Sequence, residues 1–262
     1  MPKILEVEDL HKEFTLHILN GKTIRALDRV AFAMDEGEIV GLTGKSGSGK
    51  STLMKCIHRT YLPSAGRVVM HTTRGPVDLA TASEHDVLAV RKSEMTYCSQ
   101  FLQAIPRVPA VEVVSEQLLR RGGSRDEALT LARDCFARLG LPEELWDAYP
   151  STFSGGEQQR INICRAIISK PRLLLVDEPT ASLDAKTKDV VIDMILELKS
   201  HGTAIIVITH DEYSLRRMAD RCLHLEHGAV RPSTLLGTNP STSLGTSPSP
   251  AAVDQAVAVT SC

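Results

Sequence analysis

The sequence predicts an α/β protein with a mostly parallel sheet at its core, an N-terminal antiparallel β subdomain and an inserted helical subdomain. Three observations support this prediction. Continuous apolar runs at 173–176 and 204–208 are typical of strands buried on both faces of a parallel sheet, and a helical pattern lies between them. Residues 1–40 have the pattern of paired strands instead. Within 101–165, two helical patterns follow one another with no strand between them, which breaks the β-α alternation.

The N-terminal region predicts antiparallel strands. A strand begins at residues 4–7, and the runs FTLHIL and KTIRAL flank Asn20-Gly21, a dipeptide that favours a two-residue hairpin turn. Further along, RVVMH and PVDLA predict another short antiparallel pair. We expect a brief helix at 88–92 and a strand at 95–98.

The second half predicts helices at 112–121 and 125–139, which Gly122-Gly123 separates and Gly140 ends. A further amphipathic helix is expected at about 185–199. The tail, 231–262, is rich in Ser, Thr, Pro, Gly and Ala and has almost no charge. Such a segment cannot bury enough surface to offset its chain entropy, so we expect it to be disordered and assign it no function.

Composition excludes several classes of function. The 262 residues carry a formal net charge of −2 without a polybasic segment, so nucleic acid is not an expected partner. No apolar run of membrane-spanning length and no signal segment is present, so we expect a soluble, cytoplasmic protein that does not insert into a membrane. The scattered cysteines favour free thiols in a reducing compartment; they are Cys56, Cys98, Cys135, Cys164, Cys222 and Cys262.

The most informative stretch is GLTGKSGSGKSTL, residues 41–53, which fits the pattern G-x-x-x-x-G-K-[ST]. An apolar strand precedes it and a helix follows, so the glycine-rich backbone can point successive N–H groups at an anion. A plain glycine-rich turn is the alternative. Lys50 would add a positive charge near the β and γ phosphates, and the Ser51 hydroxyl would bind Mg²⁺. The sequence therefore predicts an ATP site whose contacts are Gly44, Ser46, Gly47, Ser48, Gly49, Lys50, Ser51 and Thr52.

Two adjacent carboxylates end the predicted strand at 173–176. In an open α/β sheet, ligands bind beyond the carboxyl ends of the strands, so these acids can share an edge with the phosphate loop. Asp177 is placed to hold Mg²⁺, and Glu178 to accept a proton from the attacking water or to orient it. Two carboxylates beside a triphosphate would repel it, so a divalent cation has to be part of the site. A pair of acids that merely ends a strand is the alternative.

The stretch STFSGGEQQR, residues 151–160, predicts a helix start with a capping box between Ser154 and Glu157. A glycine-rich helix N-terminus with a hydroxyl is also an anion site. The run 154–158 resembles the signature motif of the ATP-binding cassette (ABC) ATPase family, with Phe153 where leucine is usual. The resemblance implies a dimer in which the ATP bound by the second subunit is contacted by Ser154, Gly155, Gly156 and Glu157.

This resemblance covers residues 1 to about 230 and implies an ABC-type P-loop NTPase domain with its helical subdomain at about 101–165. It implies that Gln100 contacts Mg²⁺ and senses the γ phosphate, and that His210 is the catalytic switch histidine. It implies that Asp184, in the segment Ser182-Leu183-Asp184, lies along a dimer interface beside the nucleotide. Phe14 lies where the family stacks an aromatic ring on adenine.

The same resemblance implies a head-to-tail dimer, formed with a second copy or with a related ABC ATPase, that closes on ATP and opens after hydrolysis. Three segments, 100–114, 141–146 and 149–167, are similar to the ABC-type subunit of bacterial carbon–phosphorus lyase systems, which implies soluble subunits of a phosphonate-degrading complex as partners. The chain itself has no cysteine cluster for an iron–sulfur radical centre, so we expect it not to cleave the C–P bond. Two alternatives remain: the ATPase of a membrane transporter of lipoprotein-releasing or peptide-exporting type, and a nucleotide-gated clamp with slow turnover.

Overall fold

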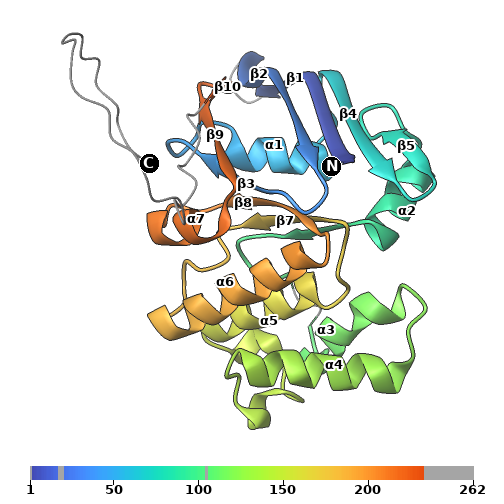
Figure 1. The fold of residues 1–262 in the computed structure, drawn as a ribbon, viewed down its shortest axis with the longest axis vertical. Helices are drawn as coiled ribbons and strands as arrows, with labels where there is room; N and C mark the ends of the chain where they lie inside the picture. The colour runs from blue at the N-terminus through green and yellow to red at the C-terminus, as the bar shows by residue number, and fades with distance from the viewer. Residues whose placement is uncertain (1, 17–20, 104–105, 233–262) are drawn as a thin grey trace, which may run out of the picture.

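The computed structural model describes residues 2–16, 21–103 and 106–232, which form two sheets and a set of helices (Figure 1). The first sheet is antiparallel, with strand order β2-β1-β4-β5. Its strands are β1 (Lys3–Leu16), β2 (Lys22–Asp35), β4 (Ala65–Thr72) and β5 (Gly75–Asp78). The predicted N-terminal antiparallel subdomain is therefore confirmed.

The second sheet has six strands in the order β10-β9-β3-β8-β7-β6 and is parallel except for its β9-β10 edge pair. Its strands are β3 (Ile39–Thr43), β6 (Met95–Cys98), β7 (Leu173–Asp177), β8 (Ala204–Ile208), β9 (Arg221–Glu226) and β10 (Ala229–Pro232). Every residue of β7 and β8 is buried, which confirms that their apolar runs are central strands. Successive β7 residues pack into different cores: Leu173 and Leu175 on one face, Leu174 and Val176 on the other.

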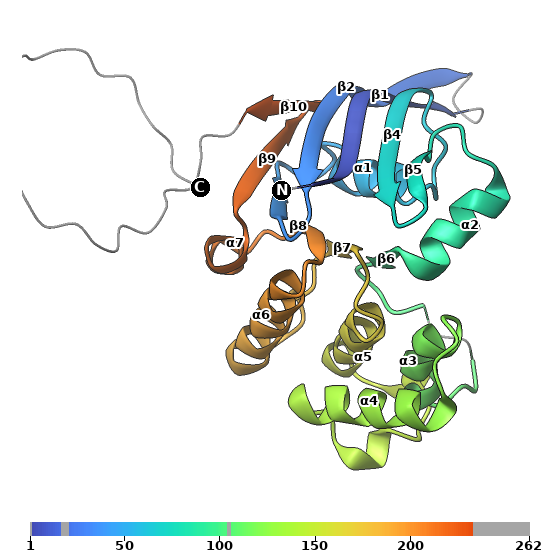
Figure 2. The same ribbon diagram turned by 45° about the vertical axis from the view of Figure 1, so that its right-hand side comes forward.

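The helices cover both faces of this sheet (Figures 1 and 2). One helix, α1 (Lys50–Ile57), lies between the two sheets, whereas α5 (Gly155–Ile167) and α6 (Ala185–Ser200) cover the opposite face. The helices α3 (Ala110–Leu119) and α4 (Arg125–Arg138) lie farthest from the sheet and pack on α5. The remaining elements are α2 (Glu84–Ser93), α7 (Glu212–Met218) and the 3₁₀ turns η2 (Glu143–Leu145) and η3 (Pro150–Thr152). One continuous apolar cluster joins α3 and α4 to the lower sheet face, so the helical subdomain shares its core with the sheet.

Some predicted boundaries need correction. The helix expected at 88–92 runs over Glu84–Ser93, because the Ser83 hydroxyl accepts a hydrogen bond from Asp86 N and starts it earlier. The predicted tail boundary at 231 was wrong by two residues, since Arg231 and Pro232 complete β10 and pair with β9. The rest of the tail, 233–262, and Asn20 of the predicted hairpin turn lie outside the described residues.

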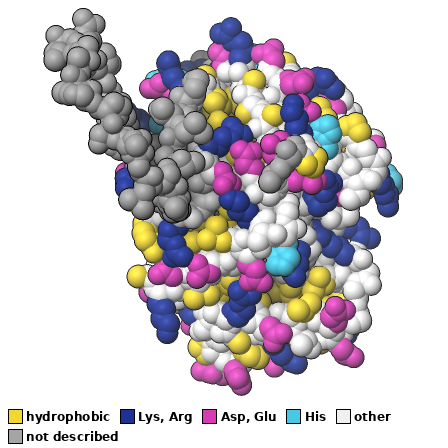
Figure 3. Space-filling model, viewed as in Figure 1, with side chains coloured by type: hydrophobic (Ala, Val, Ile, Leu, Met, Phe, Trp, Pro, Cys, Tyr) yellow, Lys and Arg dark blue, Asp and Glu magenta, His cyan; other side chains and the backbone are white. Residues whose placement is uncertain are grey.

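Basic and acidic side chains are interspersed on the face shown in Figure 3. Within the described ranges, no helix has the length and apolarity needed to cross a bilayer. The thiols of Cys56, Cys98, Cys135 and Cys164 are free and buried in the core.

Candidate nucleotide-binding site

The phosphate loop joins β3 to α1 and depends on glycine at specific positions. Gly44, Gly47 and Gly49 have φ values of 133°, 78° and 107°, a region that L-residues rarely adopt. A Cβ on Gly44 would overlap the carbonyl oxygen of Leu225, and one on Gly49 would lie 2.6 Å from that of Ala26. A Cβ on Gly47 would meet nothing within 4 Å, so this part of the loop is open. The loop is therefore fixed against β9 and β2 while its tip faces outward.

Lys50 is folded into this loop. Its ammonium donates hydrogen bonds to Gly44 O at 2.6 Å and to Lys45 O at 3.0 Å, and the residue is only 7% exposed. Burial lowers the pKa of Lys50, although the nearby charges of Glu178 and Asp177 oppose that shift. The cation is thus held at the loop, with the two acids close enough to influence it.

Ser48 provides a test of whether the loop fits a phosphate. Its Oγ is buried inside the loop beside Gly44, and no hydrogen-bond partner for it exists within the described residues. An unpaired buried hydroxyl costs about 1–3 kcal/mol, which a phosphate oxygen accepting its proton would recover. The loop's open tip, its lysine and this hydroxyl all fit a bound polyphosphate.

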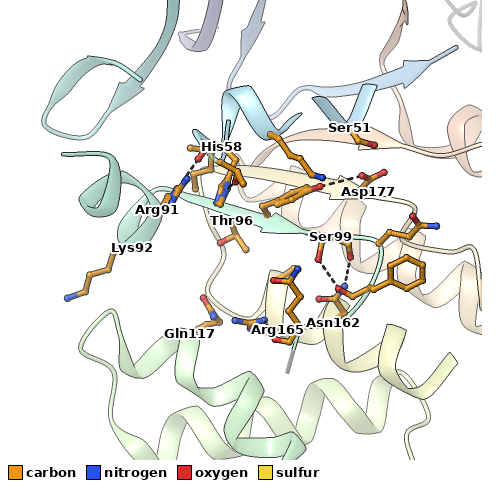
Figure 4. Close-up of a pocket in the computed structure, with 18 of the residues that line it drawn as sticks. Ser51, His58, Arg91, Lys92, Thr96, Ser99, Gln117, Asn162, Arg165 and Asp177 are labelled. Carbon is orange, nitrogen blue, oxygen red and sulfur yellow. Dashed lines mark hydrogen bonds between the residues drawn. The ribbon is translucent and has the colours of Figure 1, made fainter. Parts of the chain in front are cut away.

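The three residues predicted to hold Mg²⁺ line one cleft of about 910 Å³ (Figure 4). Ser51 comes from α1, Asp177 from the end of β7, and Gln100 follows β6. Their hydroxyl, carboxylate and amide oxygens are the ligand types that Mg²⁺ prefers. The sequence did not predict Tyr97, whose hydroxyl donates to Asp177 Oδ2 at 3.4 Å from the neighbouring strand. Burial raises the pKa of Tyr97 further above its ordinary value, so the phenol stays a donor to this carboxylate.

Glu178 occupies an unusual backbone conformation, with φ at 55° and its N–H bonded to Ile208 O at 2.9 Å. Its side chain is 15% exposed, and burial raises the pKa of the carboxyl, with the charge of His210 acting in the opposite direction. His210 Nε2 lies 3.4 Å from Glu178 Oε1, and the imidazole is 64% exposed. The predicted base and the predicted switch histidine therefore meet at the carboxyl edge of the sheet.

The predicted signature residues lie elsewhere. The capping box is confirmed: Ser154 N and Oγ each donate to Glu157 Oε2 at 2.8 Å, and Ser154 Oγ accepts from Glu157 N at 3.4 Å. These hydrogen bonds lower the pKa of Glu157. The start of α5 is not part of the cleft that Ser51 lines, and α5 lies across the sheet from α1 (Figures 1 and 2). Within one chain, the phosphate loop and the signature residues at the start of α5 are therefore separate. Such a separation is needed if the signature residues are to contact the nucleotide of another subunit.

Two further predicted residues have local contacts in the structure. Asp184 caps α6, accepting hydrogen bonds from Thr187 N at 3.0 Å and Thr187 Oγ1 at 2.7 Å, and these bonds lower the pKa of Asp184. The Phe14 ring meets Tyr61 edge-on at 5.3 Å, and Lys12 Nζ lies 4.7 Å from the Phe14 centroid. The interface role of Asp184 and the adenine contact of Phe14 stay predictions.

Comparison with known proteins decides the family. Residues 27–181 match the family model described as ABC transporter. The chain belongs to the ABC ATPase family. It is 33% identical over 236 residues to the methionine import ATP-binding protein MetN 1 of Listeria monocytogenes serotype 4b, covering 89% of the chain and 67% of that relative. It is 37% identical over 210 residues to the lipoprotein-releasing system ATP-binding protein LolD of Shewanella sp. strain MR-7, covering 80% and 88%.

Solved structures agree with this ABC ATPase assignment. The dimeric post-hydrolysis state of the ATP-binding cassette MJ0796, bound to ADP and Pi, superposes with a TM-score of 0.81 at 28% identity, covering 90% of this chain and all of that one. The chain is therefore an ATPase of the ABC-type P-loop fold, which uses ATP with Mg²⁺. Both named relatives belong to import or release systems, and this supports the transporter alternative more than a phosphonate-degrading complex.

Proposed function

We propose that this ABC ATPase is the energy-coupling subunit of a membrane transport system, closing with a second cassette on ATP and opening after hydrolysis. The observation that carries the proposal is the position of the phosphate loop, the cleft and Glu178 at one sheet edge, with the signature helix start apart from them. A site divided in this way is completed by a second cassette.

Within the site, each group has a distinct task. Lys50 would exchange its two loop carbonyls for phosphate oxygens, and Ser48 would gain the partner that it lacks. Ser51, Gln100 and Asp177 would hold Mg²⁺, which when bound supplies positive charge at the β and γ phosphates. Glu178 would accept the proton of the attacking water, since its raised pKa makes it a stronger base than an exposed glutamate.

The dimer follows from the position of Ser154. Ser154 caps α5, which lies on the other side of the sheet from α1 (Figure 2), so we propose that its hydroxyl and the first N–H groups of α5 meet a triphosphate only on a facing subunit. The relative MJ0796 has been solved as a dimer bound to ADP and Pi. We propose the same head-to-tail arrangement here, with a second copy or with a related ABC ATPase.

The end of the cleft at α3, away from Ser51 and Asp177, is the proposed coupling surface to the transport system. The cleft begins at Asp177 and runs to α3 between the core and the helical subdomain (Figure 4). Its lining includes five basic residues, namely Lys55, Arg91, Lys92, Arg120 and Arg165. Phe101, at its edge, is 74% exposed. The relatives MetN and LolD, as parts of import and release systems, support a membrane component as the occupant.

A second candidate partner is favoured by a specific observation. Gln100, Phe101 and Gln103 line this cleft, and they belong to the 100–114 segment that resembles the carbon–phosphorus lyase ABC subunit, designated PhnL. The other two resembling segments, 141–146 and 149–167, extend from the helical subdomain into α5. A soluble phosphonate-degrading complex would then occupy the coupling surface.

Capture of partners separates the candidates. Tagged Glu178→Gln protein, incubated in native lysate with ATP and Mg²⁺, should retain the closed state and its partner; Lys50→Met protein is the matched control that should lose both. A polytopic membrane protein identified by mass spectrometry supports the transporter, and soluble phosphonate-pathway subunits would replace it with the second candidate. If the protein is a nucleotide-gated clamp, its ATP hydrolysis should be slow and unaffected by the captured partner. If it couples hydrolysis to a transporter or to a phosphonate-degrading complex, the partner should stimulate hydrolysis.

A further inference from the structure

One side of α5 touches two loops that carry proposed site residues: the loop between β7 and α6, which it contacts twice, and the loop that follows β6. Gly156, Gln159 and Asn162 are spaced by three along the helix, so they are neighbours on its surface. A Cβ on Gly156 would lie 3.0 Å from Ser182 O, which places the loop before Asp184 directly against the helix. The first contact is thus a close backbone approach near the predicted dimer interface.

The second contact reaches the proposed base. Gln159 is 5% exposed, and its Nε2 donates hydrogen bonds to Glu178 O and Pro179 O, both at 3.1 Å. Glu178 needs such support, because its backbone has a φ of 55° that a glutamate rarely adopts. Its N–H is already bonded to Ile208 O, so Gln159 fixes the other end of the same residue.

The third contact reaches the predicted metal ligand Gln100. Asn162 is 4% exposed, and its Nδ2 donates to Ser99 O at 2.6 Å, one residue before Gln100 (Figure 4). The thiol of Cys98 in turn donates to Asn162 O at 3.7 Å. The loop that follows β6 is therefore tied to α5 from both directions.

We propose that Gln159 and Asn162 are positioning residues through which α5 sets the Glu178 and Gln100 loops of its own subunit. This inference rests on the proposed roles of Glu178 and Gln100 in hydrolysis.

The test for Gln159 is a split between kcat and KM. Gln159→Met keeps the volume but removes the donor, and we expect kcat for ATP to fall about tenfold to a hundredfold while KM stays unchanged, since misplacement of about 1 Å has that effect. Thr203→Val is the matched control: it removes a buried side-chain bond to Pro171 O, far from the site, and should cost stability without lowering kcat.

A second variant keeps the test decisive if Gln159→Met does not fold. Gln159→Glu has the same shape, but its carboxylate cannot donate to two carbonyl oxygens, whereas its protonated form can donate one bond. Its kcat relative to wild type should therefore rise as the pH falls. If kcat of Gln159→Glu equals that of wild type at every pH, the positioning role of Gln159 is refuted.

Asn162 should give a different signature. Asn162→Leu frees the loop that carries Gln100, so we expect a severalfold higher Mg²⁺ concentration for half-maximal turnover, with kcat at saturating Mg²⁺ less affected. An unchanged Mg²⁺ requirement would refute this part. Glu178→Gln, assayed in parallel, keeps the two proposals distinct. Wild-type turnover by Glu178→Gln would refute the assignment of Glu178 as the base. If Glu178→Gln is inactive but the Gln159 variants turn over ATP like wild type, only the positioning inference is refuted.

Discussion

Lys50→Met is the most informative single change, because it removes the ammonium while keeping the methylene stem that fills the base of the loop. In the structure that ammonium donates hydrogen bonds to Gly44 O and Lys45 O, and Lys50 as a residue is almost fully buried. The variant therefore separates the contribution of the charge from that of packing.

The expected magnitude follows from these contacts. A charge pair about 4 Å apart at an effective dielectric constant of about 20 contributes about 4 kcal/mol. Lys50 gives up two carbonyl bonds to reach a phosphate, and each is worth about 1 kcal/mol net. About 2 kcal/mol remains, which corresponds to a roughly 30-fold weaker affinity for ATP in the variant.

Isothermal titration calorimetry with ATP at fixed Mg²⁺ and ionic strength measures this effect. Lys199→Met, which breaks an ion pair with Asp220 at the C-terminal end of α6, is the control and should bind ATP like wild type. Burial lowers the pKa of Lys50, so removal of its disfavoured charge raises stability, whereas loss of the two carbonyl bonds lowers it; because the two effects oppose each other, Tm should change little. Wild-type affinity in Lys50→Met would refute the phosphate contact, and a large fall in Tm would refute the packing argument.

Three further predictions address neighbouring groups. Glu178→Gln should lower turnover about 10²- to 10⁴-fold. Because burial raises the pKa of Glu178, its ionised form destabilises the folded chain at neutral pH. The variant should therefore raise the Tm measured by calorimetry at pH 7.5, and this increase should shrink as the pH falls. Gly44→Ala should destabilise the chain by about 3 kcal/mol or more through overlap with β9, whereas Gly47→Ala should cost about 1 kcal/mol for its φ alone, and equal urea midpoints would contradict this contrast. Glu157→Gln keeps the capping box but removes a negative charge beside Ser154, so sedimentation in the Glu178→Gln background should show a tighter ATP-dependent dimer.

The elements that could be predicted are those whose signal is local. The β8 strand has the predicted bounds because a run of five apolar residues leaves little choice of state. The α2 helix was predicted too short because only Val87 and Val90 are buried, and its first turn is polar. The strand β10 was not predicted, and its last two residues were assigned to the tail because Arg231-Pro232 resembles that segment; only pairing with β9 makes them part of a strand.

The residues of the site likewise divide into those with a local sequence signal and those that depend on long-range contacts. Phosphate-loop chemistry is contained in the eight consecutive residues 44–51, so the motif alone places Lys50 and Ser51. The contacts of Tyr97 with Asp177, of Gln159 with Glu178 and of Asn162 with Ser99 span 80, 19 and 63 residues. No local spacing encodes such pairs, because they depend on which strand lies beside which and on the face that α5 turns toward the sheet.

In the proposed dimer, Ser154 would connect nucleotide binding to closure. In the single chain its hydroxyl already donates to Glu157, so a phosphate on a facing subunit has to replace that bond and approach a carboxylate. We therefore expect closure to be weak without the charge of Lys50 and Mg²⁺ to offset the phosphate, and to strengthen when the triphosphate is fully coordinated. Linkage requires that ATP tighten the dimer by the same factor by which dimerisation tightens ATP. A cassette whose ATP affinity did not depend on its own concentration would show that the two events are uncoupled, and Ser154 would then act only as a helix cap.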